Sequence, residues 1–272
     1  MEAYGIQRAI DAARSTAMEL GLIARDAVVI QDSNKLTLRL RPCDVLARVS
    51  PMADQSARFE VDVAQRLADL GSPVAALEAP QVFVRDDYIV TLWTYYEPVT
   101  TQAIPPAAYA DALERLHAGM RKVELAAPRF TDRVSAAQTL VADHERTPDL
   151  ADVDRAFLAD TLARLRQTVS QSGRPEQLLH GEPHPGNLLS TDAGLLFIDF
   201  ETCCLGPIEF DLAHAPVEVA DHYPGVDHHL LRNCRILALA MATTWRWDRN
   251  DRFPDARRIG VEWLSEIRIL MS

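Results

Sequence analysis

The spacing of apolar residues changes along the chain and separates two regions of different predicted structure. Apolar side chains recur at helical spacing over residues 6–20, which predicts a first helix. Five short stretches with strand-like patterns follow, at 27–31, 36–41, 45–50, 81–85 and 88–93. A second helix, predicted over 54–70, lies between the third and fourth of these strands. The first region is therefore expected to be an antiparallel sheet of five strands with one inserted helix.

Beyond Glu97-Pro98 the apolar spacing becomes predominantly helical. Six further helices are predicted, at 105–121, 132–145, 153–170, 208–219, 227–246 and 254–270. A small hairpin that turns at 191–194 separates the first three from the last three. We therefore expect an α+β protein with one lobe at 1–97, a hinge near 94–97 and a mainly helical lobe at 98–272.

Composition and charge exclude several classes of protein. The 272 residues are 48% hydrophobic and 25% charged, as in an ordinary folded protein. A net charge of −11 argues against nucleic-acid binding, because no basic stripe is available to neutralise phosphates. The four cysteines lack metal-site or secreted-disulfide spacing, and no stretch of about 20 apolar residues suggests a membrane span. We expect a cytoplasmic protein that binds neither membrane nor nucleic acid.

Candidate chemistry concentrates in residues 173–206, which contain five of the eleven glycines. Glu182 is followed five residues later by Asn187, and Asp199 ends a short apolar run. Protein kinases use this arrangement for phosphoryl transfer, with one acid beside the acceptor hydroxyl and an Asn and an Asp that bind magnesium. The alternative is a Gly/Pro-rich surface turn in which Asp199 is a helix cap or a solvated carboxylate.

Three motifs in this segment resemble those of the aminoglycoside phosphotransferase family, also called the phosphotransferase enzyme family. Residues 180–187, His-Gly-Glu-Pro-His-Pro-Gly-Asn, resemble its catalytic loop, His-Gly-Asp-x-His-x-x-Asn. Residues 198–201, Ile-Asp-Phe-Glu, resemble its metal-binding motif. Residues 206–213, Gly-Pro-Ile-Glu-Phe-Asp-Leu-Ala, resemble its downstream Gly-x-Pro-x-x-Asp-Leu-Ala. The resemblance implies a two-lobed, protein-kinase-like fold.

The same resemblance assigns roles residue by residue. Glu182 takes the place of the catalytic aspartate and would orient and partly deprotonate the acceptor hydroxyl. Asn187 and Asp199 would bind Mg²⁺ that bridges the phosphates of a nucleoside triphosphate. His180, His184 and Asp211 are expected to support the loop structurally. Because Glu is one methylene longer than Asp, either the loop has adapted to the longer acid or catalysis has been lost.

The first lobe carries the expected nucleotide-binding residues. Arg48 lies where kinases place a phosphate-contacting lysine on the third strand, and Glu60 on the next helix is its expected partner. The alternative is a solvated arginine and a helix-face glutamate. Ser33 and Asn34 lie in the loop expected over the phosphates, which contains no glycine.

Residues at the hinge and around the acceptor are also predicted. Thr94 and Tyr96 are expected to contact the nucleobase at the hinge. Glu201, Glu145 and Glu218 are candidate acceptor-binding acids, and Glu201 is favoured because it lies beside the metal motif. Such acids would attract a cationic substrate, although a neutral hydroxylated one remains open.

These predictions indicate a kinase that transfers the γ-phosphoryl group of ATP or GTP to a hydroxyl of a small molecule. The acceptor would be an aminoglycoside-like antibiotic or a hydroxylated metabolite. Two alternatives are a nucleotide-binding pseudokinase with a regulatory or scaffold role and a kinase that acts on a protein. The pattern specifies neither the nucleobase nor the number of subunits.

Overall fold

The chain folds into two compact units that interleave along the sequence. The computed structural model describes residues 3–97, 99, 104–192 and 194–272. Unit 1 comprises residues 1–124 and 186–202, and unit 2 comprises residues 125–185 and 203–272. The lobe boundary expected at 94–97 stays a prediction, since the units are groups of neighbouring residues and unit 1 takes in a later segment.

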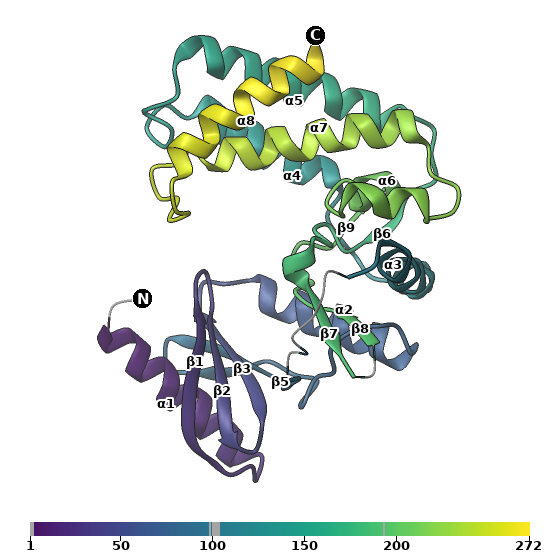
Figure 1. The fold of residues 1–272 in the computed structure, drawn as a ribbon. Helices are drawn as coiled ribbons and strands as arrows, with labels where there is room; N and C mark the ends of the chain where they lie inside the picture. The colour runs from purple at the N-terminus through teal and green to yellow at the C-terminus, as the bar shows by residue number, and fades with distance from the viewer. Residues whose placement is uncertain (1–2, 98, 100–103, 193) are drawn as a thin grey trace. The chain divides into compact units, whose positions relative to one another are not determined.

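Unit 1 is built on an antiparallel sheet of five strands in the order β1-β2-β3-β5-β4 (Figure 1). The strands are β1 (Ala24–Asp32), β2 (Leu36–Pro42), β3 (Val45–Pro51), β4 (Phe83–Arg85) and β5 (Tyr88–Thr94). Its helices are α1 (Ala3–Glu19), α2 (Ser56–Asp69) and α3 (Pro106–Met120). The predicted strands and inserted helix are present, with ends that differ by at most three residues.

The alternation of side chains along β3 explains how unit 1 places polar groups. Val45, Ala47 and Val49 are buried and belong to the core that the sheet forms with α1. Because successive strand residues point to opposite faces, Arg48 points away from that core. The sheet therefore has one face committed to α1 and one face that presents a charged side chain.

The second segment of unit 1 is a small hairpin formed by β7 (Leu188–Thr191) and β8 (Gly194–Phe197). Phe197 joins this hairpin to the stretch after α2, because its N–H donates to Pro73 O at 2.8 Å and its carbonyl accepts from Ala75 N at 3.1 Å. The Phe197 side chain is buried and makes an edge contact with Tyr109 of α3. Residues just after β8 are thereby fixed within unit 1.

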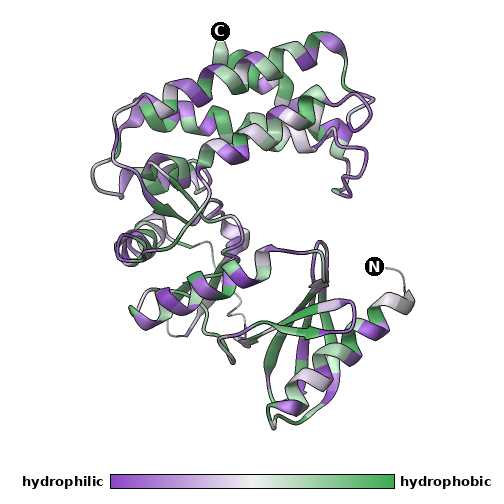
Figure 2. Ribbon diagram, turned by 180° about the vertical axis from the view of Figure 1, so that it is seen from behind, coloured by the Kyte–Doolittle hydropathy of each residue, from purple (hydrophilic) through white to green (hydrophobic). Residues whose placement is uncertain are grey.

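Unit 2 is mainly helical (Figure 1). It contains α4 (Phe130–Ala142), α5 (Asp152–Ser170), α6 (Ile208–Leu212), α7 (His228–Trp245) and α8 (Ala256–Met271), with a two-stranded ribbon of β6 (Gln177–Leu179) and β9 (Cys204–Gly206). Its longer helices carry both apolar and polar residues along their length, as Figure 2 shows. Their apolar faces meet in one core. No described helix has the length and hydropathy needed to cross a membrane.

One helix prediction is wrong. A single helix was expected over 208–219, but the chain forms α6 and then a separate 3-10 helix at Val217–Asp221. Pro216 lies between them in an extended conformation with ψ of 147°. Proline has no backbone N–H and disfavours helical geometry at the preceding residue, so a continuous helix cannot pass through this position.

Candidate functional site

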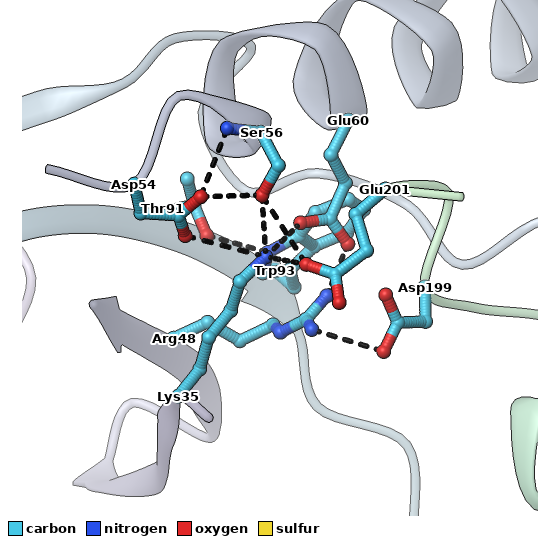
Figure 3. Close-up of polar contacts among 9 residues, drawn as sticks. All are labelled: Lys35, Arg48, Asp54, Ser56, Glu60, Thr91, Trp93, Asp199 and Glu201. Atoms are coloured by element: carbon cyan, nitrogen blue, oxygen red, sulfur yellow. Dashed lines mark hydrogen bonds and ion pairs between the residues drawn. The ribbon is translucent and has the colours of Figure 1, made fainter. Parts of the chain in front are cut away.

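A cluster of charged, buried or partly buried side chains lies in unit 1 (Figure 3). Arg48 reaches into it from β3, and Lys35 reaches into it from the residue before β2. Glu60 enters from α2 and is 1% exposed, so its carboxylate is almost fully removed from water. Asp199 and Glu201 follow β8. Asp54, which precedes α2, lies 3.7 Å from Lys35 Nζ. Segments far apart in the sequence thus meet at one group of two cations and four carboxylates.

Hydrogen bonds and ion pairs connect these side chains. Glu60 pairs with Arg48 through one carboxylate oxygen and with Lys35 through the other, the latter at 3.1 Å. Arg48 Nη2 also lies 3.2 Å from Asp199 Oδ2. Lys35 pairs in addition with Glu201. The predicted Arg48–Glu60 pair is therefore present, and Lys35 doubles the positive charge beside Glu60.

Burial and the neighbouring opposite charges shift the pKa of each of these side chains in opposite directions. Burial raises the pKa of Glu60, against the opposing influence of Arg48 and Lys35. Burial alone would lower the pKa of Lys35, but the charges of Glu60 and Glu201 raise it overall. The pKa of Arg48 is also raised, because Glu60 and Asp199 more than offset its burial. Both cations are therefore held in their charged forms.

Asp199 has the features of a ligand-binding residue. Its φ is 67°, a left-handed conformation that costs energy for a residue other than glycine. Its Oδ1 atom is buried and has no hydrogen-bond partner in the part of the chain that the structure describes. Backbone strain together with a buried, unpaired oxygen is expected where a missing ligand completes the site.

The oxygen atoms around Asp199 fit a hard divalent cation. Ligand oxygens of Glu60, Asp199 and Glu201 lie within 4.8 Å of one another. Asn187 lies next to this group, because Asn187 O accepts a 3.1 Å hydrogen bond from Ile198 N. Mg²⁺ prefers such oxygen ligands and keeps several of its waters. Glu60 already pairs with both cations, so Asp199, Asn187 and Glu201 are the better candidates to hold the metal.

The loop that contains Glu182 lies in unit 2 and is braced from α6. The buried Asp211 carboxylate accepts hydrogen bonds from the backbone N–H groups of His180 and Gly181, both at 2.8 Å. The Glu182 side chain is paired with Arg133 of α4, whose other terminal nitrogen donates to Gly181 O at 2.8 Å. Arg133 therefore fixes both the side chain of Glu182 and the backbone just before it.

Glu182 opens onto a cavity of about 740 Å³ within unit 2. His184 and His214 also line it, together with residues from α7 and α8. The Nε2 atom of His214 is buried and has no hydrogen-bond partner among the described residues. Burial, followed by the nearby positive charge of Arg133, lowers the pKa of His214 to about 4. The cavity therefore combines a carboxylate with a neutral imidazole at pH 7.

Four other predicted residues lie in unit 1. Ser33 and Asn34 are exposed in the turn between β1 and β2, where Ser33 Oγ accepts from Gln31 Nε2 at 3.2 Å. At the expected hinge, Thr94 N donates to Ala76 O at 2.9 Å, and the Tyr96 hydroxyl accepts from Ala76 N at 3.2 Å. These contacts join the hinge strand to the segment after α2. Nucleotide contacts by these four residues stay predictions.

The three predicted acceptor acids belong to different units. Glu201 lies in unit 1, where its carboxylate binds Lys35 and accepts from Ser56 Oγ at 3.2 Å. Glu145 and Glu218 are exposed in unit 2, and neither is part of the lining of the cavity beside Glu182. A role for these acids in acceptor binding stays a prediction.

Sequence analysis missed Lys35 and Arg133. Lys35 ends the loop expected over the phosphates and was not among the predicted site residues, but its side chain is only 8% exposed and joins the charge cluster. Two features of the sequence could have indicated Lys35 as a site residue. It lies directly before an apolar strand, and its partner Glu60 was already a candidate. Arg133 pairs with a residue 49 positions away, and no local pattern indicates that contact.

Comparisons with known proteins identify the family and the fold. The family model for the phosphotransferase enzyme family matches residues 25–232. No curated protein sequence matches the chain.

Solved structures share the fold at low sequence identity. A choline/ethanolamine kinase family protein from Mesorhizobium loti is 16% identical, with a TM-score of 0.73 over 98% of this chain and 95% of its own. The amicoumacin kinase hAmiN is 12% identical, with a TM-score of 0.75 over 99% and 96%. The choline kinase LicA from Streptococcus pneumoniae is 15% identical, with a TM-score of 0.69 over 95% and 96%. The predicted kinase-like α+β fold is confirmed.

Proposed function

Because the chain belongs to the phosphotransferase enzyme family, we propose that it transfers the γ-phosphoryl group of ATP or GTP to a hydroxyl of a small molecule. The predicted enzyme class, a nucleoside-triphosphate-dependent phosphotransferase with an alcohol acceptor, is confirmed at the level of the family. The activity of this chain, its metal and its acceptor are the subject of the proposal.

The charge cluster of unit 1 is the observation that carries the proposal. Phosphoryl transfer needs little covalent chemistry from the protein, but it needs cations and precise positioning around the phosphates. Arg48 and Lys35 supply two cations that Glu60 fixes in place, beside Asp199 with its unpaired oxygen. A structural ion-pair network alone would give Asp199 no reason to adopt a strained backbone with an unsatisfied buried atom.

Asp199 and Asn187 would hold Mg²⁺, with Glu201 beside them. When bound, the metal neutralises charge on the phosphates. Arg48 and Lys35 would bind phosphate oxygens. Glu182 would orient the acceptor hydroxyl and accept its proton. Arg133 holds Glu182 by an ion pair and by the contact with Gly181 O.

Arg133 also bears on how Glu182 could replace an aspartate. The longer side chain shifts a carboxylate by about 1 Å unless the backbone retracts, and misplacement on that scale can cost about 100-fold in rate. A fixed partner defines a single position for the longer acid. We therefore favour an active enzyme over the pseudokinase alternative.

The test is a paired measurement of nucleotide binding and phosphoryl transfer. Calorimetric titration with ATP and GTP, with and without MgCl₂, should give metal-dependent binding. Incubation with γ-labelled nucleotide and pooled alcohols should then transfer label to at least one pool. Absence of binding to either nucleotide would contradict the proposal. Metal-dependent binding without transfer to any alcohol would instead favour the nucleotide-binding pseudokinase.

A further inference from the structure

The cavity beside Glu182 has a basic lining, although the chain as a whole carries a net charge of −11. Four arginines and two glutamates line it: Arg133, Arg232, Arg235, Arg246, Glu182 and Glu266. A cationic acceptor, as the candidate acids suggested, would meet predominantly like charge in this cavity. The charges of the lining side chains therefore bear on which class of acceptor the cavity can bind.

Two of the arginines are already balanced by acids. Arg133 pairs with Glu182. Arg246 lies 3.3 Å from Asp251 and stacks over the Phe253 ring at 4.3 Å from its centroid. Their positive charges are therefore committed to partners within unit 2.

The other two arginines are bound only to backbone carbonyl groups. Arg232 Nη2 donates to Leu270 O at 3.0 Å, and Arg235 Nη2 donates to Val217 O at 3.1 Å. Among the described residues, neither has a carboxylate within ion-pair distance. A guanidinium has five N–H donors, so both retain donors for a ligand. Glu266 contributes one negative charge to the lining from α8.

Arg232 and Arg235 both line the cavity from α7. They are three residues apart on α7, a spacing that places two side chains on the same helix face. Like charges in one cavity repel each other, and a bound anion would reduce that cost. Burial lowers the pKa of Arg235, although Asp221 and Glu218 act in the opposite direction. Its charge is thus only partly compensated by the protein.

The remaining lining is suited to an apolar body that carries a hydroxyl. Leu239 and Met241 of α7 line the cavity, as does the Trp245 side chain, which is 38% exposed. His214 also lines the cavity, and its Nε2 atom is buried without a hydrogen-bond partner among the described residues. A neutral imidazole nitrogen can donate to or accept from a hydroxyl group.

We propose that the acceptor is an anionic alcohol with an apolar body, bound through its carboxylate or phosphate by Arg232 and Arg235 while its hydroxyl faces Glu182. This inference rests on the proposed kinase function and names the substrate class of that same site. In the transfer step, the hydroxyl oxygen forms a bond to the γ-phosphorus as the bond from that phosphorus to the β-γ bridging oxygen breaks. Glu182 takes the hydroxyl proton, and the nucleoside diphosphate leaves.

The test compares four pools of alcohols in the phosphoryl-transfer assay: hydroxycarboxylates, phosphorylated alcohols, neutral alcohols and amino alcohols. The inference predicts transfer to one of the first two pools, and their separate use distinguishes a carboxylate from a phosphate group. For the best anionic substrate, Arg232→Gln/Arg235→Gln should raise KM by at least about 10-fold, the loss expected for one charge-assisted hydrogen bond. The exposed Arg249→Gln is the control and should leave KM unchanged.

The outcomes separate this inference from the kinase function itself. Transfer only to neutral or amino alcohols would retain the kinase function and overturn the anionic acceptor. An unchanged KM in the double variant would also overturn it. If no pool is phosphorylated, thermal stability with 3-phenyllactate and the phosphorylated alcohols becomes the deciding measurement. Stabilisation of the parent and not of the double variant would support an anion site, whereas equal shifts or none would reject it.

Discussion

The substitution Glu60→Gln tests whether the charge cluster of unit 1 depends on one buried carboxylate. Glu60 is 1% exposed and pairs with both Arg48 and Lys35. Gln keeps the size of the side chain but removes its charge, so two largely buried cations lose their shared partner. Breaking a buried ion pair from one side typically costs about 3–5 kcal/mol, because a charge is left uncompensated. Asp199 and Glu201 remain nearby, so we expect the lower part of that range.

Hydrogen exchange measured by mass spectrometry is the suitable assay, because it reports on unit 1 peptides separately from unit 2. Peptides from α2 and β3 should exchange about 100-fold faster or more in Glu60→Gln, as a loss of about 3 kcal/mol requires. Asp62→Asn is the matched control on the same helix. Asp62 forms an exposed ion pair with Arg66, four residues later, and its loss should cost about 0.5 kcal/mol or less.

A second comparison tests the cause of the loss. Arg48→Met in the Glu60→Gln background removes one of the two stranded cations, so the double variant should be less destabilised than the sum of the single variants. If the amides of α2 and β3 exchange no faster in Glu60→Gln than in Asp62→Asn, the Glu60 carboxylate does not neutralise the charges of Arg48 and Lys35.

Three further predictions concern the two candidate sites. Glu182→Gln should abolish phosphoryl transfer without weakening nucleotide binding, whereas Glu182→Asp should retain some transfer; a Gln variant as fast as the parent would reject Glu182 as the proton acceptor. Asp199→Asn should abolish Mg²⁺-dependent triphosphate binding with the fold intact, and Asn187→Ala should impair this binding less because Asn is a neutral ligand. Calorimetry measures the binding and circular dichroism measures the fold. Full binding by Asp199→Asn would remove the metal assignment. The pKa of His214 is lowered from 6.5 to about 4 in the folded protein. As pH falls through this interval, His214 therefore takes up a proton in the unfolded chain but not in the folded one. The free energy of unfolding should decrease by up to roughly 3 kcal/mol between pH 6.5 and 4. Urea midpoints at several pH values should show a shallower decrease in His214→Gln, and identical slopes would show that His214 is accessible to protons in the native state.

The sequence predicted the elements well where periodicity alone determines them. The five strands and the helix α2 follow from local alternation, and their ends differ from the expected ones by at most three residues. The error at 208–219 also has a local cause, since Pro216 was present in the sequence but its effect was outweighed by the apolar spacing around it. That part of the fold could have been predicted correctly.

The contacts of the candidate sites could be predicted only in part. Arg48 and Glu60 were paired from their expected places on a strand and the following helix, and the structure brings them together. Lys35 and Glu201 are 166 residues apart, and only the return of the β7–β8 hairpin to unit 1 makes them neighbours. The basic cavity depends likewise on which face α7 turns toward α6 and α8. Such information is held in tertiary packing and not in the spacing of a single segment.

The discontinuity of unit 1 has a consequence for the order in which the protein can assemble during synthesis. Residues 1–124 leave the ribosome well before residues 186–202, yet the later segment supplies Asp199 and Glu201. Until it arrives, Arg48 and Lys35 share Glu60 and lack two of the carboxylates that surround them in the finished protein. The nascent N-terminal portion therefore carries an incomplete charge cluster. A fragment that ends at residue 124 contains all five strands of the sheet but lacks the return segment that completes the candidate site.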